Sequence, residues 1–310
     1  MTVSSIVPPG PHGGDGPRLA RALGVSREAV LDLSVSLNPC APDVAPLVAR
    51  HAASVRHYPD PGPAVEALAE AMGVDADRLV LTNGGAEAIA LVAAELPVGH
   101  VDDPDFSLYA RHLVRLDSSG LRWGSNPRNP TGRLAAPDEH RDVWDEAFYP
   151  LATGRWTRRD PDAVVVGSLT KLFACPGLRL GYVIAPDDDL PERVRRHQPA
   201  WAVNSLAIAV LPDLLAHADL ARWAEQITAL RDDLAAVLHA AGLTPEPSDA
   251  NYVLVRDASG LREHLARHRV LVRDTATFGI PDAVRIAVPN PAGLDELRRA
   301  LEKWKPCSTP

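Results

Sequence analysis

The chain has 310 residues, of which 46% are hydrophobic, so it is long enough to bury one or two cores. Its formal net charge of -8 and its scattered arginines argue against nucleic acid as a partner. Because the first residues lack a basic flank and no stretch approaches the length of a membrane span, we expect a cytoplasmic protein without membrane contacts.

Short apolar runs alternate with helical patterns along the chain, which is typical of an α/β fold. An N-terminal arm rich in glycine and proline precedes an extended segment, DLSVSL, and two helical segments. The stretch RLVLTNGGAEAIALVAAEL then predicts a strand, a glycine turn and a helix. The free amides of Gly85 and Ala86 at the start of that helix suit a phosphate, although a simple connecting turn has the same pattern.

The second half of the chain predicts a strand-rich region followed by a separate smaller unit. Residues 98–145 contain several short strands with almost no room for helices, and the buried strand DAVVVGSLTK ends at Lys171. A long helical pattern after residue 205 predicts a connector, and the tail reads as a compact α+β unit. We therefore expect an N-terminal arm with a small-domain segment (1–44), a large domain (45–218) and a small C-terminal domain (219–310).

Lys171 is the only lysine in the body of the chain, because Lys303 and Lys305 lie in the last eight residues. Positive charge elsewhere in the body of the chain is carried by arginine. This lysine therefore indicates a need for an amine that can lose its proton. Its position at a strand end is where ligands collect in α/β sheets.

Three kinds of chemistry compete for this lysine. Ser168 and Lys171 match the Ser-x-x-Lys pairing of acyl-transfer enzymes, but the companion motifs Ser-Asp-Asn and Lys-Thr-Gly do not occur. The Gly-x-Gly-x-x-Gly pattern of a dinucleotide site is also absent. The third alternative is a Schiff base between the lysine and a carbonyl cofactor. No metal site is expected, because His264 and His268 stand among arginines with no third ligand in view.

Four motifs in order favour the Schiff base: SNPRNPTG (125–132), DEAF (145–148), SLTK (168–171) and then Arg179. With this order and spacing the sequence resembles the fold-type I pyridoxal phosphate enzymes, the aspartate aminotransferase superfamily. The resemblance covers nearly the whole chain. It implies an α/β fold with a large, cofactor-binding domain built on a mainly parallel, seven-stranded sheet, a small α+β C-terminal domain, and pyridoxal 5'-phosphate as the cofactor.

Further motifs narrow the resemblance to the branch that holds histidinol-phosphate aminotransferase and threonine-phosphate decarboxylase. HGGD (12–15), DLSVSLNP (32–39) and WAVNSLA (201–207) look more like the decarboxylase side. The branch implies decarboxylation of O-phospho-L-threonine to 1-amino-2-propanol phosphate in cobalamin biosynthesis, or transamination of histidinol phosphate or a related amino acid with 2-oxoglutarate. It also implies a homodimer with shared sites, in which Tyr58 reaches the cofactor phosphate of the neighbouring subunit.

The resemblance assigns roles to individual residues. Lys171 would form the Schiff base, Asp145 would keep the pyridine nitrogen protonated, and Asn129 would lie against the ring hydroxyl. Phe106 would stack on the ring, with Tyr109 as the second candidate. The cofactor phosphate would be held by Ser168, Arg179, Gly85 and Ala86, and the substrate by Arg285, Arg273, His12 and Asn38.

Two departures from the family pattern bear on this assignment. Phe148 stands where aminotransferases of the group usually have a tyrosine that donates to the ring oxygen, which fits transamination less well. Only 19 residues separate Tyr109 from Asn129, and 15 separate Asn129 from Asp145, so at least two helices of the large domain are missing. We expect the sheet to expose an apolar face there unless a partner covers it. A cofactor-binding regulatory protein without turnover stays open as an alternative.

Overall fold

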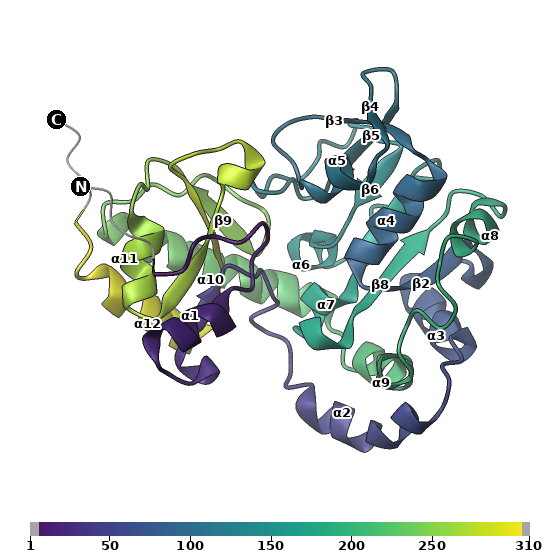
Figure 1. Cartoon of the computed structure of the whole chain (residues 1–310), viewed down its shortest axis with the longest axis horizontal. Coiled ribbons are helices and arrows are strands. Elements are labelled where there is room, and N and C mark those ends of the chain that lie inside the picture. Colours follow the sequence, from purple (N-terminus) through teal and green to yellow (C-terminus); the bar gives the residue numbers. More distant parts are fainter. Residues whose placement is uncertain (1–5, 306–310) are drawn as a thin grey trace.

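The computed structural model describes residues 6–305, which fold into two lobes connected by a long helix (Figure 1). This helix, α10 (Leu220–Ala240), contributes Trp223 and Ile227 to the core of the larger lobe. Leu234 and Leu238, nearer its C-terminal end, belong to the core of the smaller lobe. One helix therefore packs into both cores, which fixes the two lobes to each other.

The larger lobe is built on a seven-stranded sheet, so the predicted α/β fold with a mainly parallel sheet is confirmed. Only β8 runs antiparallel to its neighbours β2 and β7. The strands in spatial order are β2 (Leu79–Asn83), β8 (Leu180–Ile184), β7 (Val164–Ser168), β6 (Val143–Asp145), β5 (Leu121–Ser125), β3 (Val98–Val101) and β4 (Arg115–Leu116).

Around β2, β7 and β8, apolar side chains on both faces bury the sheet between two layers of helices. Val80, Val166 and Val183 pack with α4 (Gly85–Glu95), α5 (Leu108–His112) and α8 (Leu190–Arg195). Alternate residues of the same strands face α3 (Gly62–Met72) and α9 (Ser205–Ala216). This arrangement explains the nearly continuous apolar runs of β2, β7 and β8.

On β3, β5 and β6 the second face of the sheet has no covering helix, as the short intervals predicted, but it is not apolar. Register places His100, Arg122, Gly124 and Trp144 on this face. Trp144 is buried beneath two guanidinium groups, those of Arg158 at 5.2 Å and Arg141 at 6.0 Å from its ring centre. The expected exposed apolar face is therefore wrong, because arginine side chains take the place of the missing helices.

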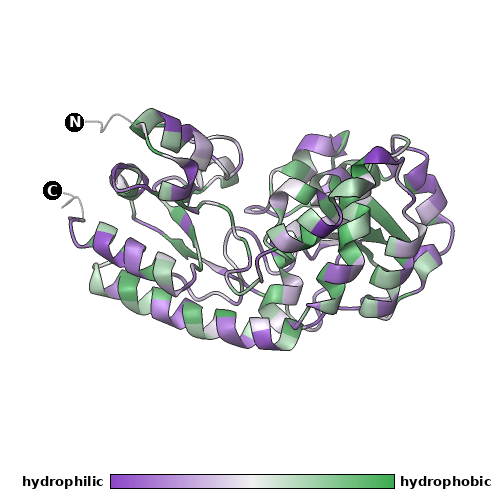
Figure 2. Ribbon diagram, turned by 90° about the horizontal axis from the view of Figure 1, so that it is seen from below, coloured by the Kyte–Doolittle hydropathy of each residue, from purple (hydrophilic) through white to green (hydrophobic). Residues whose placement is uncertain are grey.

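The smaller lobe contains a four-stranded sheet to which both ends of the chain contribute. Figure 2 shows helices on both sides of its strands, with the long helix α10 along the lower edge of the lobe. The N-terminal strand β1 (Leu31–Leu33) pairs in parallel with β10 (Val270–Asp274), followed by the antiparallel β11 (Val284–Ala287) and β9 (Tyr252–Val255). The surrounding helices are α1 (Gly16–Leu23), α11 (Leu261–Arg267) and α12 (Pro291–Leu301).

Short helices complete the fold. They are α2 (Ala45–Arg50), α6 (Tyr149–Thr153) and α7 (Leu169–Leu172), with 3-10 turns at Arg27–Ala29, Ala52–Arg56, Ala76–Arg78, Pro176–Leu178 and Ala276–Phe278. Within residues 6–305 no helix has the length and apolar character needed to cross a membrane. The two sheets agree with a two-domain organisation, while the domain limits given above stay a prediction.

Candidate active site

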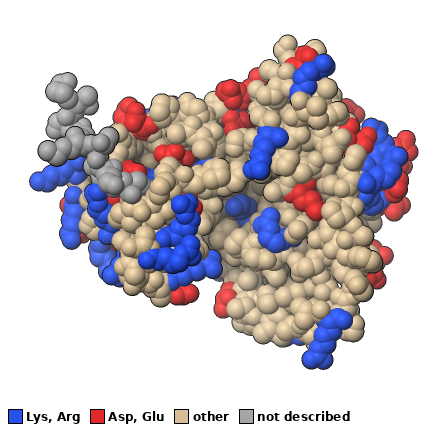
Figure 3. Space-filling model, viewed as in Figure 1, with Lys and Arg blue, Asp and Glu red and all other residues tan. Residues whose placement is uncertain are grey.

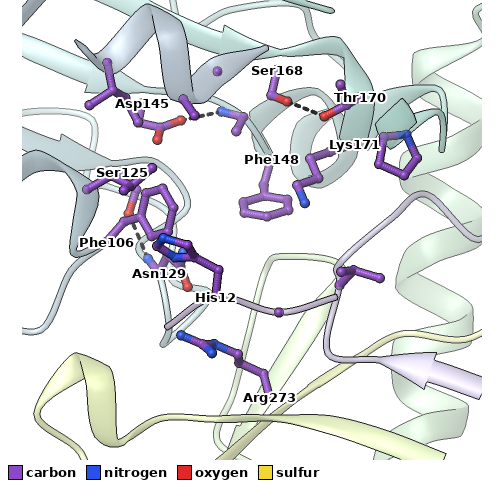
Figure 4. Close-up of a pocket in the computed structure, with 18 of the residues that line it drawn as sticks. His12, Phe106, Ser125, Asn129, Asp145, Phe148, Ser168, Thr170, Lys171 and Arg273 are labelled. Carbon is purple, nitrogen blue, oxygen red and sulfur yellow. Dashed lines mark hydrogen bonds between the residues drawn. The ribbon is translucent and has the colours of Figure 1, made fainter. Parts of the chain in front are cut away.

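A cavity of about 290 Å³ opens between the two lobes, in the hollow seen in Figure 3. It lies at the C-terminal ends of β5, β6 and β7, the edge at which open α/β sheets bind ligands. Side chains of both lobes and of the N-terminal arm converge there (Figure 4). Eleven of the thirteen predicted site residues line it: His12, Gly85, Ala86, Phe106, Asn129, Asp145, Ser168, Lys171, Arg179, Arg273 and Arg285.

Lys171 lies in α7, directly after the end of β7, and its ammonium group has no hydrogen-bond or ion-pair partner among the described side chains. Burial, with the nearby Arg285 and Arg179, lowers the pKa of Lys171 to about 8. A large fraction of this amine is therefore neutral near pH 8 and able to attack a carbonyl. Ser168 Oγ pairs with Thr170 Oγ1 at 2.7 Å instead of with the lysine, which does not fit a serine nucleophile activated by Lys171.

Asp145 ends β6 as a buried carboxylate. It accepts hydrogen bonds from the Tyr109 hydroxyl at 2.8 Å and from the Ala147 amide at 3.0 Å. Burial raises the pKa of Asp145, and the two hydrogen bonds oppose that effect. Tyr109 is itself fully buried and does not line the cavity, so it orients Asp145, and Phe106 is the aromatic ring that faces the site.

A glycine turn beside a guanidinium group lies where β2 meets α4. Gly84 has φ +80°, and a Cβ on it would come within 2.3 Å of Arg179 Nη2. Among residues 6–305, the acceptors of the same guanidinium group are two backbone carbonyls, those of Pro176 and Asn83. The amides that begin α4, the Ser168 and Thr170 hydroxyls and this arginine therefore leave room for a phosphate dianion.

The opposite side of the cavity is formed by Asn129 and Arg285. Arg285 on β11 donates from Nη1 to Asn129 Oδ1 at 2.6 Å. Its guanidinium carbon lies over the Tyr252 ring, 4.7 Å from the ring centre. Its Nε is buried and has no hydrogen-bond partner within the described part of the chain. Burial lowers the pKa of Arg285 to about 10, so the group is still a cation at neutral pH. A carboxylate in the cavity would satisfy the unpaired Nε.

The N-terminal arm crosses the mouth of the cavity and is held by Arg273. This buried side chain donates to the carbonyls of Gly10 at 2.9 Å and Pro11 at 2.7 Å, and to Thr277. Because two of its nitrogens are used in this way, Arg273 holds the arm in addition to lining the cavity.

The arm places His12 over the cavity, beside Phe106, with 6.0 Å between the ring centres (Figure 4). His12 Nδ1 is buried and has no partner, and burial next to Arg273 and Arg111 lowers the pKa of His12. The following glycine is required, because a Cβ on Gly13 would lie 2.3 Å from the Ser34 carbonyl oxygen. The HGGD segment thus carries an imidazole to the site on a closely packed turn.

Two predicted residues do not line the cavity. Asn38 is buried behind Lys171, where its side chain binds the Leu172 carbonyl and the Cys40 amide, so it supports the backbone instead of facing a ligand. Tyr58 is 79% exposed on the larger lobe and stacks on Trp201 at 4.7 Å.

The sequence analysis did not assign several residues that the structure brings to the site. Thr170 could have been read from its place between Ser168 and Lys171, and Ser125 from its place at the start of the SNPRNPTG motif, whereas nothing in the sequence pattern marks Phe278. The cavity is also lined by Ser34, Val35, Leu108 and Phe148. No group of three or more metal-ligating side chains occurs among residues 6–305.

Residues 123–301 match the family model described as Aminotransferase class I and II. The chain belongs to this family. Threonine-phosphate decarboxylase of Salmonella typhimurium is 30% identical over 94% of this chain and 95% of that protein. Histidinol-phosphate aminotransferase 2 of Pseudomonas aeruginosa is 30% identical over 92% of each chain. The alignment with the Salmonella protein spans 348 positions, more than the 310 residues of this chain, so that protein has segments that this chain lacks.

Solved structures show the same fold. The L-threonine-O-3-phosphate decarboxylase of Porphyromonas gingivalis is 25% identical, with a TM-score of 0.75 over 88% of this chain and 98% of that one. The histidinol-phosphate aminotransferase of Sinorhizobium meliloti, solved with pyridoxal-5'-phosphate, is 18% identical, with a TM-score of 0.79 over 92% of this chain and 93% of that one.

Family membership confirms the predicted enzyme class and cofactor, a pyridoxal phosphate enzyme of the lyase or transferase kind. The cavity fits this cofactor on its own evidence. It offers an unpaired amine at Lys171, a buried carboxylate at Asp145 and a glycine cradle at Gly84 that a side chain would fill.

Proposed function

We propose that this chain decarboxylates O-phospho-L-threonine to (R)-1-amino-2-propanol phosphate in the cytoplasm, as a step of cobalamin biosynthesis. The observation that supports it best is the set of cationic and donor groups around one free amine. Arg285, Arg273 and His12 face Lys171 from the smaller lobe and the arm. A substrate with both a carboxylate and a phosphate would match these groups.

Bound pyridoxal phosphate supplies an aldehyde for the substrate amine and a protonated ring that withdraws electrons from the α-carbon. Lys171 would hold the cofactor aldehyde and Asp145 the proton on the ring nitrogen. Ser168, Arg179 and the amides of Gly85 and Ala86 would bind its phosphate. Phe106 would pack against the ring and, with the arm above it, exclude water.

The chain's own groups then decide which bond breaks. Arg285 and Asn129 would hold the carboxylate, and His12 with Arg273 would bind the phosphate at the mouth. When the bond from the α-carbon to the carboxylate breaks, carbon dioxide leaves without the bonding electron pair. A proton from Lys171 or from water then takes its place on the α-carbon.

A second candidate function, transamination of histidinol phosphate or a related amino acid with 2-oxoglutarate, uses the same groups and breaks the α-carbon to hydrogen bond. Phe148 favours decarboxylation over this alternative. It lines the cavity at the position where aminotransferases of the branch have a tyrosine, and its ring packs edge-on against Tyr252 at 5.2 Å without a hydroxyl to donate.

We also propose that the active protein is a homodimer with shared sites. Tyr58 and Trp201 stack on the surface with 79% and 63% of their areas exposed, together with the exposed Val55. Aromatic side chains exposed to this degree are typical of an interface with another chain. Tyr58 would then contribute to the partner's cavity.

The test is incubation of the pyridoxal phosphate-loaded protein with O-phospho-L-threonine and no oxo acid, with an assay for 1-amino-2-propanol phosphate and carbon dioxide. We expect both products in equal amounts, and none from Lys171→Ala. If neither forms while histidinol phosphate and 2-oxoglutarate yield glutamate, the protein is an aminotransferase. If no substrate reacts although the protein binds the cofactor and turns yellow, the regulatory alternative holds.

A further inference from the structure

A second cavity, of about 130 Å³, lies beneath the arginine-covered face of the large sheet. We name it the arginine cavity, because Arg128, Arg133 and Arg141 line it. Ser125 lines both this cavity and the candidate active site, so the two share a wall. A single water needs roughly 10–15 Å³ of such volume, so the arginine cavity has room for a larger occupant.

The unpaired groups of the arginine cavity are donors. Arg141 is only 7% exposed, and its two terminal nitrogens pair with Asp102 and Glu139 at 2.6 and 2.8 Å. Its Nε, however, is buried with no hydrogen-bond partner. The Arg133 guanidinium group makes no ion pair or hydrogen bond with any side chain in residues 6–305. Arg133 is exposed, so it is Arg141 Nε that points to a ligand: a buried donor without a partner is rare in folded proteins and indicates an occupant that accepts hydrogen bonds.

The carboxylate acceptors of the cavity, in contrast, already accept hydrogen bonds from other groups. The Asp105 carboxylate accepts from the Ser125 hydroxyl at 2.5 Å, the Ser125 amide at 3.1 Å and the Phe106 amide at 2.7 Å. Glu139 accepts from Arg141. Among residues 6–305, neither carboxylate accepts a hydrogen bond from Arg141 Nε.

The turn that carries Asn129 also sets the spacing of two of the arginines. The Arg128 amide donates to the Arg133 carbonyl at 2.8 Å, and the Gly132 amide donates to the Arg128 carbonyl. This turn presents Asn129 to the active site and the arginines on either side of it to the second cavity. The site is thus built from a short segment that lies where the chain is trimmed.

We propose that the arginine cavity binds a small oxyanion, a phosphate or a carboxylate, separately from the substrate site. Arg141 would donate through its unpaired Nε, Arg133 would contribute a mobile cation from the rim, and Arg128, 4.0 Å from Asp105, would complete the positive wall. Charge-assisted hydrogen bonds of this kind are about twice as strong as neutral ones. The Arg141 and Trp144 contact would stiffen the back of the site.

The test uses the pyridoxal phosphate-loaded protein, titrated calorimetrically with inorganic phosphate and, separately, with acetate. Because the substrate site also binds anions, we compare Arg133→Gln and Arg141→Gln with the native chain, and use Arg115→Gln, an exposed arginine outside the cavity, as the control. We expect the control to match the native chain. In each cavity variant the affinity of one of the binding events should fall by about tenfold or more, because one charge-assisted hydrogen bond is lost.

Crystals soaked in selenate locate the anion by its anomalous signal, which should appear among the three arginines. The proposal is overturned if both cavity variants bind phosphate and acetate as the native chain does, or if selenate is found only in the substrate site. Arg133→Gln keeps the test valid if Arg141→Gln fails to fold, because Arg133 is exposed and Arg141 is buried.

Discussion

Arg285 of the smaller lobe donates a hydrogen bond to Asn129 of the larger lobe at 2.6 Å, and this contact connects two residues 156 positions apart inside the active-site cavity. Asn129 is itself fixed by a bond from its amide to Ser125 Oγ at 2.8 Å. The two lobes therefore form one wall of the cavity, in which the guanidinium group that we propose to bind the substrate carboxylate is oriented by a side chain of the other lobe.

Asn129→Ala should lower kcat/KM by roughly 10- to 100-fold, because it removes an acceptor from a buried charged donor. Arg285→Gln should have a similar effect. Since the two residues act as a unit, the double variant should lose far less than the product of the single losses. Steady-state kinetics of the native chain, the two single variants and the double variant give the coupling free energy between the two residues. Strictly multiplicative losses would show that the contact has no role in holding the substrate.

The rate of cofactor incorporation should depend on the ionisation of Lys171. With its pKa lowered to about 8 by burial and by Arg285 and Arg179, the amine becomes neutral, and reactive toward an aldehyde, as the pH rises through that value. The yellow absorbance should therefore form faster up to about pH 8 and then level off. A rate still rising above pH 9.5 would contradict the lowered pKa. Lys303→Arg is the control.

The same shift has a consequence for stability. The pKa of Lys171 is lower in the folded apo-protein than the ordinary value of 10.5, so between about 8 and 10.5 the unfolded chain binds more protons. This group's contribution to the free energy of unfolding should therefore increase with pH in that window. In Lys171→Met the contribution should disappear, as measured by urea unfolding of both apo-proteins.

Gly84→Ala should weaken cofactor binding by about tenfold or more. The new Cβ would approach Arg179 Nη2 to 2.3 Å, and alanine is strained at a φ of +80° by about 1–3 kcal/mol. Gly177→Ala is a matched control in the nearby 3-10 turn, because its Cβ would meet no atom within 4 Å. Quenching of tryptophan fluorescence by the cofactor gives its dissociation constant from each of the two variants. Equal affinities for the two variants would remove Gly84 from the phosphate cradle.

Arg273→Gln should release the N-terminal arm. Its donors to the Gly10 and Pro11 carbonyls are lost, and His12 would no longer be held over the cavity. We expect faster proteolysis within the first 15 residues and a higher KM, with a smaller change in kcat. The exposed Arg267→Gln provides the control. An arm as resistant to protease as in the native chain would show that other contacts are sufficient to hold it.

The sequence brought the main predicted residues to one cavity because they follow the ends of strands, where one motif is enough to place a side chain. Asp145 and Lys171 are of this kind. It did not predict that Tyr109 binds Asp145, because hydrogen-bond partners 36 positions apart depend on how α5 packs. Spacing revealed the missing helices. The expectation of an apolar uncovered face was wrong, because it overlooked that Arg122 and Gly124 alternate with the core residue Trp123 and so lie on that face.

Mixing two inactive variants tests the shared site. If Tyr58 serves the cavity of the partner subunit, Lys171→Ala and Tyr58→Ala subunits, refolded together, should form a heterodimer with one intact site. Random association in equal amounts makes about half the dimers mixed, so the mixture should recover about a quarter of native activity. Val114→Ala, at an exposed position far from Tyr58 in the chain, replaces Tyr58→Ala in the control mixture. Absence of recovery from the first mixture, in a preparation shown by mass spectrometry to contain heterodimers, would mean that Tyr58 serves the cavity of its own subunit, because each mixed dimer has its intact Lys171 and its intact Tyr58 on opposite subunits.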